Sequence, residues 1–97
     1  MARTYELMVV YAPEDSDEQA ARRLAGLRDL LAQNGSDGID INDWGRRRLA
    51  YPIKRHFEGQ YVLAQFTTES GSGNQQVERA LTIDERVLRH LLVRRDA

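Results

Sequence analysis

Six segments with the hydrophobic patterns of strands and helices follow one another along this chain, and their order most constrains its fold. Tyr5 to Tyr11 is a nearly continuous apolar run with β-branched and aromatic members, which is typical of a buried strand. A helix is predicted next, because apolar residues recur at spacings of four, three and four before Asn34-Gly35 ends the pattern. These apolar residues are Ala20, Leu24, Leu27 and Leu31.

A β-hairpin is predicted in the middle of the chain. Alternating apolar and polar residues begin a strand at Ile39, which is expected to continue to Ile53, and Tyr61 to Thr68 forms the next strand. The polar tip is predicted at Lys54-Arg55-His56, with Phe57-Glu58-Gly59 still in the connection.

The last third of the chain repeats the helix and strand patterns. Asn74 is the predicted cap of a second helix, on which Val77, Ala80 and Leu81 face inward. Val87 to Val93 is the last predicted strand.

The resulting order, β-α-β-β-α-β, predicts an α+β fold with a single domain covering residues 1–97. It matches a ferredoxin-like sandwich, in which a four-stranded antiparallel sheet carries two helices on one face. The other face of such a sheet stays uncovered, so apolar groups on it would form a docking surface.

Patterns for catalysis or metal binding are missing from the sequence. The chain has no cysteine, and His56 and His90 lie far apart without neighbours that suggest a metal site or a catalytic dyad. The acidic run from Glu14 to Glu18 suits helix capping better than metal binding. We therefore expect no enzyme, no cofactor and no small-molecule substrate. No apolar run approaches the ~20 residues that cross a bilayer, so no membrane is expected as a partner.

Charge is divided unevenly along a chain whose net charge is only −1. Residues 1–43 contain four arginines and nine acids, which gives −5, whereas residues 44–97 contain ten basic and six acidic residues, which gives +4. Arginine supplies nearly all of the positive charge; its guanidinium suits phosphate contacts, although biased genome composition explains that preference equally well. The segregation predicts a basic face and an anionic partner.

The densest basic cluster is the run Arg46-Arg47-Arg48, followed by Lys54-Arg55 and close to Trp44 and Tyr51. Side chains alternate between faces on a strand, so the first and third arginines should point one way and the second the other. This pattern suits an edge strand beside a phosphate backbone. A basic edge also prevents sheets from pairing edge to edge, and for the three arginines alone this protective interpretation is equally good.

A second basic group lies near the end of the chain. It consists of Arg86, Arg89, Arg94 and Arg95. Because the first and last strands are neighbours in the ferredoxin-like order, Arg3 is expected close to this group. His90 lies within it and is expected either to stack on a base or to line the sheet edge.

Residues 45–54, here called the signature segment, read Gly-Arg-Arg-Arg-Leu-Ala-Tyr-Pro-Ile-Lys. This segment resembles the signature of the family of the sixth protein of the bacterial small ribosomal subunit. Tyr5 to Val10, Glu58 to Leu63 and Thr82 to His90 are similar to other blocks of that family. The four blocks keep the family's order and spacing, which is far more specific than one signature.

The resemblance implies a structural constituent of the small ribosomal subunit, in the cytoplasm, that supports translation. It implies binding to the central domain of small-subunit ribosomal RNA, together with the eighteenth protein of that subunit, during assembly. The signature segment is expected to contact the RNA, the partner protein or both. The expected RNA contacts are Arg3, Tyr5, Arg46, Arg47, Arg48, Lys54, Arg86, Arg89 and His90. The expected contacts with the partner protein are Trp44, Arg48, Leu49, Tyr51, Pro52 and Ile53.

Two other kinds of binding protein share the same element order. A single-strand RNA-binding module of the RRM type needs aromatic residues that Glu58-Gly59-Gln60-Tyr61 does not provide in the required pattern. A ferredoxin-like regulatory or ligand-binding dimer without RNA is the main alternative, and it predicts self-association of the isolated chain.

Overall fold

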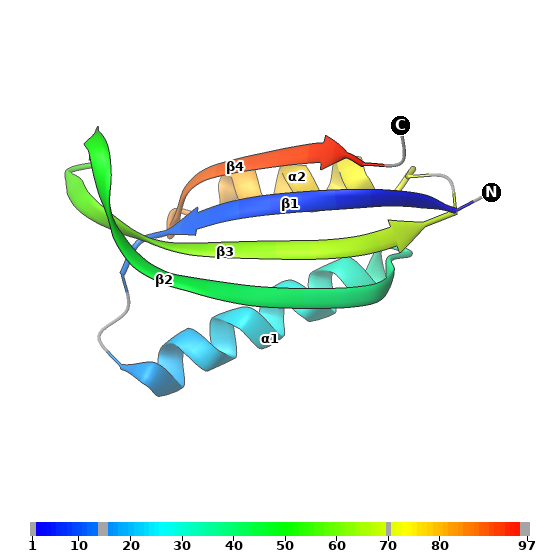
Figure 1. Cartoon of the computed structure of the whole chain (residues 1–97), viewed down its shortest axis with the longest axis horizontal. Coiled ribbons are helices and arrows are strands. Elements are labelled where there is room, and N and C mark those ends of the chain that lie inside the picture. The colour runs from blue at the N-terminus through cyan, green and yellow to red at the C-terminus, as the bar shows by residue number, and fades with distance from the viewer. Residues whose placement is uncertain (1, 14–15, 70, 96–97) are drawn as a thin grey trace.

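The computed structural model describes residues 2–13, 16–69 and 71–95, and Figure 1 shows a four-stranded sheet with two helices. In chain order the elements are β1 (Arg3–Tyr11), α1 (Asp17–Gln33), β2 (Asp37–Ile53), β3 (His56–Thr68), α2 (Asn74–Ile83) and β4 (Val87–Arg94). Within the described residues, neither helix combines the length and the apolar character needed to span a membrane.

The strands are arranged in the order β2-β3-β1-β4, and every neighbouring pair is antiparallel. β1 and β3 are therefore the central strands, while β2 and β4 form the edges. The first and last strands are neighbours and the arginine-rich strand is an edge, both as predicted. The predicted ferredoxin-like α+β fold is confirmed.

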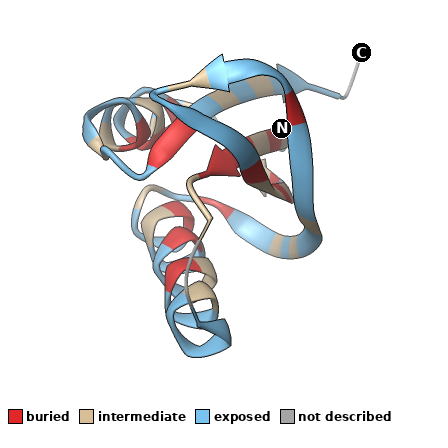
Figure 2. Ribbon diagram, turned by 90° about the vertical axis from the view of Figure 1, so that its left-hand side faces the viewer, coloured by how far each residue is buried: buried red, intermediate tan, exposed pale blue. Residues whose placement is uncertain are grey.

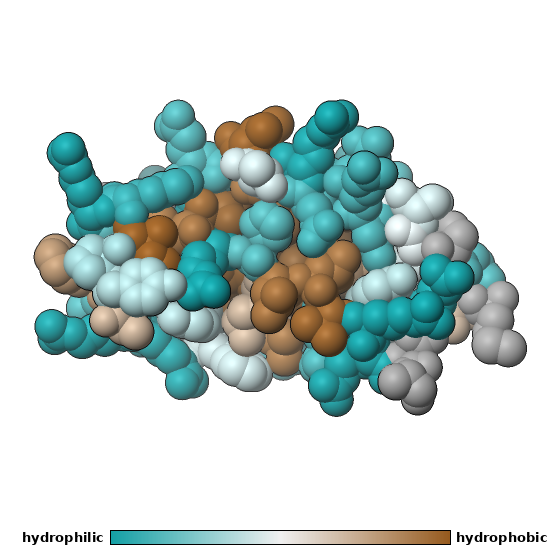
Figure 3. Space-filling view, turned by 90° about the horizontal axis from the view of Figure 1, so that it is seen from above, coloured by the Kyte–Doolittle hydropathy of each residue, from teal (hydrophilic) through white to brown (hydrophobic). Residues whose placement is uncertain are grey.

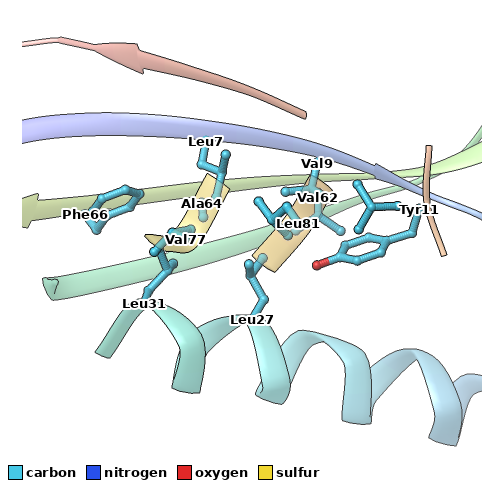
Figure 4. Close-up of a cluster of buried hydrophobic side chains, with 11 residues drawn as sticks. Leu7, Val9, Tyr11, Leu27, Leu31, Val62, Ala64, Phe66, Val77 and Leu81 are labelled. Carbon is cyan, nitrogen blue, oxygen red and sulfur yellow. The ribbon is translucent and has the colours of Figure 1, made fainter. Parts of the chain in front are cut away.

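The main core lies between the sheet and the two helices (Figure 4). Alternate residues of the central strands face the helices, because side chains on a strand point to opposite faces in turn. The helices cover them with residues from the predicted apolar stripes. The buried residues of this core include Leu7, Val9, Val62, Ala64, Phe66, Leu27, Leu31, Val77 and Leu81. Ala80, also predicted to face inward, is only half-buried.

α1 starts with a side-chain cap. Ser16 has extended backbone geometry, and its hydroxyl accepts a hydrogen bond from the backbone N–H of Gln19 at 3.1 Å. Asp17 and Glu18 follow in the first turn, where the helix dipole favours negative charge. Glu14 and Asp15, which complete the predicted acidic capping cluster, lie outside the described residues.

α2 starts without a side-chain cap, and the prediction that Asn74 supplies one is wrong. Gly73 occupies the N-cap position, while Asn74 is the first helical residue and is buried. A side-chain carbon at Gly73 would lie only 1.9 Å from the backbone oxygen of Asn34. The chain therefore passes too close to the end of α1 for any residue with a side chain, and glycine takes the position.

The hairpin turn is tighter than predicted, because β3 begins at His56 and includes Phe57-Glu58-Gly59. Only Lys54 and Arg55 lie between the paired residues Ile53 and His56. Their φ angles are 49° and 69°, which is the backbone pattern of a type I′ turn. Such turns usually carry asparagine and glycine, so a lysine followed by an arginine is no signal for one.

The turn end of the hairpin bends over the open face of the sheet and reaches β4 (Figures 1 and 2). A second, smaller core of Val10, Leu49 and Leu88 forms beneath it. The Nζ of Lys54 donates a hydrogen bond to the backbone oxygen of Val87 at 3.2 Å. At this end of the molecule the open face is therefore half-enclosed.

Candidate nucleic-acid and protein interface

The bend of the hairpin brings the signature segment against β4. Arg89 of β4 donates a hydrogen bond from Nη1 to the hydroxyl of Tyr51 in β2 at 3.2 Å. Lys54 is held at the start of β4 by its bond to Val87. Three residues from the two predicted binding regions, Tyr51, Lys54 and Arg89, thus lie at the same end of the sheet.

A cleft of about 260 Å³ lies beside this contact on the open face. The strand register explains its floor, because Val10 pairs with both Tyr61 and Arg89, and Met8 pairs with Leu91 in the next row. The cleft is lined by Met8, Val10, Leu49, Ala50, Tyr51, Ile53, Tyr61, Arg89, His90 and Leu91. Figure 3 views the molecule from the β4 side and shows apolar side chains gathered between hydrophilic ones.

The three arginines of β2 alternate as predicted. In the register, Arg46 and Arg48 lie opposite Gln60 and Glu58, on one face, whereas Arg47 lies opposite Gly59 on the other. All three side chains are exposed. The Nε of Arg46 lies 3.8 Å from the carboxylate of Glu58, an exposed pair that contributes at most about 1 kcal/mol.

A bulge interrupts the edge of β2 just before the arginines. The register shifts between Asp43 and Gly45, which leaves Trp44 as the extra residue. The carboxylate of Asp43 accepts a hydrogen bond from the N–H of Gly45 at 2.9 Å, and the guanidinium of Arg47 lies 5.8 Å from the centre of the Trp44 ring. Bulges and charges both hinder edge-to-edge pairing, so the geometry fits edge protection as well as phosphate contact.

Arg3 and Tyr5 lie at the other end of β1. Tyr5 pairs with Arg94, so the chain start adjoins the end of β4, as predicted. Arg89 instead pairs with Val10. Along β1, Val10 lies roughly 23 Å from Arg3, since a strand rises ~3.3 Å per residue. The expected neighbourhood of Arg3 therefore includes the last arginines of the chain but not Arg89, nor Arg86, whose backbone oxygen accepts a hydrogen bond from the N–H of Ala12 at that far end of β1. The predicted basic sites form two groups at opposite ends of the sheet.

Tyr5 and His90 both face the helices rather than the open face. The ring of Tyr5 stacks on Phe66, with ring centres 5.9 Å apart, and packs against the main core. The Nε2 of His90 lies 3.2 Å from the hydroxyl oxygen of Thr82 in α2. His90 therefore lines the junction between the sheet edge and α2, which was one of its two expected roles.

Arg86 also lies on the helix side, where it is paired with Asp84. Its backbone N–H donates to the Asp84 carboxylate at 2.9 Å, and its Nε lies 3.4 Å from the same group. Burial acts to raise the pKa of Asp84, but the hydrogen bonds from Arg86 outweigh it, so that the pKa is lowered. Ionised Asp84 thus holds Arg86 at the turn before β4.

A second cleft, of about 600 Å³, lies between α1 and the turn that follows α2, and it was not predicted. Buried Arg23 borders it; its guanidinium lies 4.3 Å from the centre of the Tyr11 ring, and its Nη1 donates to the backbone oxygen of Ala12 at 2.7 Å. Burial raises the pKa of Tyr11 to about 12, against the lowering effect of the Arg23 charge. The available signal was the position of Arg23, one helical turn before Leu27 on the inward stripe.

The residues expected to contact a partner protein differ in accessibility. Tyr51 and Pro52 are exposed, Trp44 is 46% exposed, and Ile53 is half-buried. Leu49 is buried against Val10 and Leu88, so its side chain holds the hairpin in place. The exposed members follow one another along the outer part of β2.

The fold and this surface together define a small ferredoxin-like domain with an arginine-rich edge and a half-enclosed open face. Residues 4–94 match the family model described as ribosomal protein S6, and the chain belongs to that family of ribosomal proteins, which are not enzymes. The small ribosomal subunit protein bS6 of Thermoanaerobacter pseudethanolicus is 36% identical over 94 residues, covering 97% of this chain and 98% of that protein. The expected location, on the ribosome in the cytoplasm, follows from this membership.

Two solved structures illustrate the shared fold. The 30S ribosomal protein S6 of Thermotoga maritima has a TM-score of 0.85 and 24% identity, covering 98% of this chain and 89% of its own. A putative PII-like signaling protein of Thermus thermophilus has a TM-score of 0.54 and 12% identity, covering 98% of this chain and 86% of its own. At such identities both show the fold alone, so the second lends the regulatory alternative only a shared architecture.

Proposed function

We propose that this chain binds the central domain of small-subunit ribosomal RNA together with the eighteenth protein of the small subunit, during assembly of that subunit. The hydrogen bond between Arg89 and Tyr51 carries the proposal, because it joins the signature segment to β4 in one surface. Membership of the ribosomal protein S6 family supports the same partners.

We assign the RNA contacts and the protein contacts to different sides of the hairpin. Arg47, Lys54 and Arg89 lie at the half-enclosed end of the open face and are proposed to contact phosphates, with Arg3 as a separate contact at the far end. Arg46 and Arg48 project from the opposite face of β2 and can meet either partner. Tyr5, Arg86 and His90 would act on RNA only from the helix side.

The exposed outer part of β2 is proposed to meet the partner protein. It comprises the exposed residues Trp44, Arg48 and Pro52 and the half-buried Ile53, with Leu49 supporting them from beneath. An edge strand offers unpaired backbone groups as well as side chains, which suits contact with another protein chain.

The test is binding of a central-domain ribosomal RNA fragment with and without the eighteenth protein across a salt series. Wild-type affinity should fall steeply with salt and rise with the partner. Arg89→Ala should weaken binding and lower the salt slope by roughly 0.7–0.9, the effect of one lost phosphate contact. Its unfolding midpoint in urea should stay nearly unchanged, because Arg89 is exposed and fills no core volume.

Arg22→Ala is the matched control, because Arg22 is an exposed arginine on α1 and lies on the helix side of the sheet, whereas Arg89 lines the open-face cleft. It should bind RNA like the wild type. An affinity that ignored both salt and the eighteenth protein would contradict the proposal, and so would an equal loss in the two variants.

A further inference from the structure

We propose that the open-face cleft beside Tyr51 holds one unpaired base of the bound RNA. This inference rests on the proposed function and goes further, since it assigns an occupant to a specific place on the sheet. It changes the expected role of Tyr51 from protein contact to base contact.

The size and lining of the cleft suit one flat apolar group. Its volume of about 260 Å³ is below the ~300–1,000 Å³ of sites that hold drug-sized ligands. Met8, Val10 and Leu91 provide an apolar floor, and Tyr51, 59% exposed, presents an aromatic ring at the mouth. Unpaired RNA bases are commonly bound by stacking on tyrosine rings and guanidinium planes.

The charges around the cleft distinguish a nucleotide from a peptide side chain. Arg89 lies at the mouth of the cleft and donates a hydrogen bond to the hydroxyl of Tyr51. Lys54 and Arg55 form the turn of the hairpin that carries Tyr51. None of the residues that line the cleft is acidic. An aliphatic side chain of a partner protein would match the apolar floor of the cleft, but it would leave these positive charges without a counter-charge. A nucleotide matches both, because it joins an apolar planar base to an anionic phosphate.

Tyr51 is the residue to change, because it is exposed and contributes little to the core. Tyr51→Leu keeps an apolar side chain but removes the ring, and Tyr51→Phe keeps the ring but removes the hydroxyl that Arg89 contacts. Loss of one base–aromatic stack should weaken binding of the ribosomal RNA fragment roughly 5- to 150-fold in Tyr51→Leu. The salt slope should not change, since no phosphate contact is lost, and Tyr51→Phe should remain within about threefold of wild type.

A direct probe is titration of the isotope-labelled chain with a short single-stranded oligoribonucleotide and with an abasic strand of the same length. Amide signals of Met8, Ala50 and Leu91 should shift with the first and not with the second, because only the first carries bases.

The outcomes separate this inference from the proposed function. One outcome is that Tyr51→Leu binds the RNA fragment as tightly as the wild type, while wild-type affinity still falls steeply with salt. The cleft then holds no base, and the proposed function stands. If Tyr51→Leu instead weakens binding of the eighteenth protein in the absence of RNA, the cleft holds a protein side chain and the inference is wrong. If the wild-type chain fails to bind the fragment at all, both proposals fall.

Discussion

Arg22 and Arg23 are adjacent on α1, but the fold uses them differently. Arg22 is exposed and pairs with Glu18 one turn away, a contact that contributes about 0.3–0.5 kcal/mol. Arg23 is buried, stacks on Tyr11 and donates to the backbone oxygen of Ala12. Its cation is therefore part of the packing between α1 and the end of β1.

Arg23→Ala should lower the free energy of unfolding by about 2 kcal/mol or more, because a desolvated cation–π contact is lost and a backbone oxygen loses its donor. Arg22→Ala should cost less than about 0.5 kcal/mol. Urea unfolding of the two variants measures the difference. Equal losses would mean that the burial of Arg23 contributes nothing to stability.

The face of the sheet to which a side chain points could be predicted from the sequence where the residue lies on a regular strand. The alternation of the three signature arginines needed only the pleat of a strand, and the structure confirms it. The contact of Arg89 with Tyr51 was beyond that reasoning, because the two are 38 positions apart and meet only through the bend of the hairpin. Arg23 was missed since arginine on an apolar stripe is normally read as solvated.

The turn of the hairpin between β2 and β3 consists of two residues with a backbone geometry that is unfavourable for residues with a side chain. Lys54 and Arg55 both have positive φ, a region that costs residues with a side chain roughly 1–2 kcal/mol each. Lys54 gains an anchor on Val87 in return, whereas Arg55 is exposed. The turn thus stores strain that a single substitution can release.

Arg55→Gly should raise the stability of the chain by several tenths to about 1 kcal/mol, because glycine adopts positive φ without strain but orders a more flexible chain. Arg55→Ala is the control, since it removes the same side chain while retaining the strained Cβ, and it should give no gain. Thermal and urea unfolding report both variants. A gain in the alanine variant as large as in the glycine variant would trace the effect to charge, not to backbone geometry.

The type and order of all six elements could be predicted from periodicity, but their ends could not. β3 was placed too late because Phe57-Glu58-Gly59 looks like a connection, whereas the I′ turn needs only two residues. Asn74 has the chemistry of a cap, yet the close approach of Gly73 to Asn34 sets the start of α2. Such ends depend on distant contacts, which no local pattern contains.

At the scale of the whole molecule, the bend of the β2–β3 hairpin over the sheet creates the half-enclosed surface. Without it the open face would stay uncovered along a molecule whose longest dimension is 41 Å, and the signature segment would lie far from β4. Gly59 makes the bend possible, because a Cβ there would lie 2.5 Å from Cγ1 of Val10 and 3.3 Å from Cδ2 of Leu49. The hairpin and β1 are therefore in direct contact at Gly59, where any larger residue must displace the side chain of Val10.

Gly59→Ala should lower the free energy of unfolding by about 1–3 kcal/mol, the usual cost of overpacking a close contact. Val10→Ala alone should cost a similar amount through the cavity it leaves. In the double variant the new methyl group fits the space that valine vacates, so its loss should be smaller than the sum by about 1 kcal/mol or more. Urea unfolding of the four chains measures this coupling. Additive losses would mean that the hairpin does not rest on Val10 at Gly59.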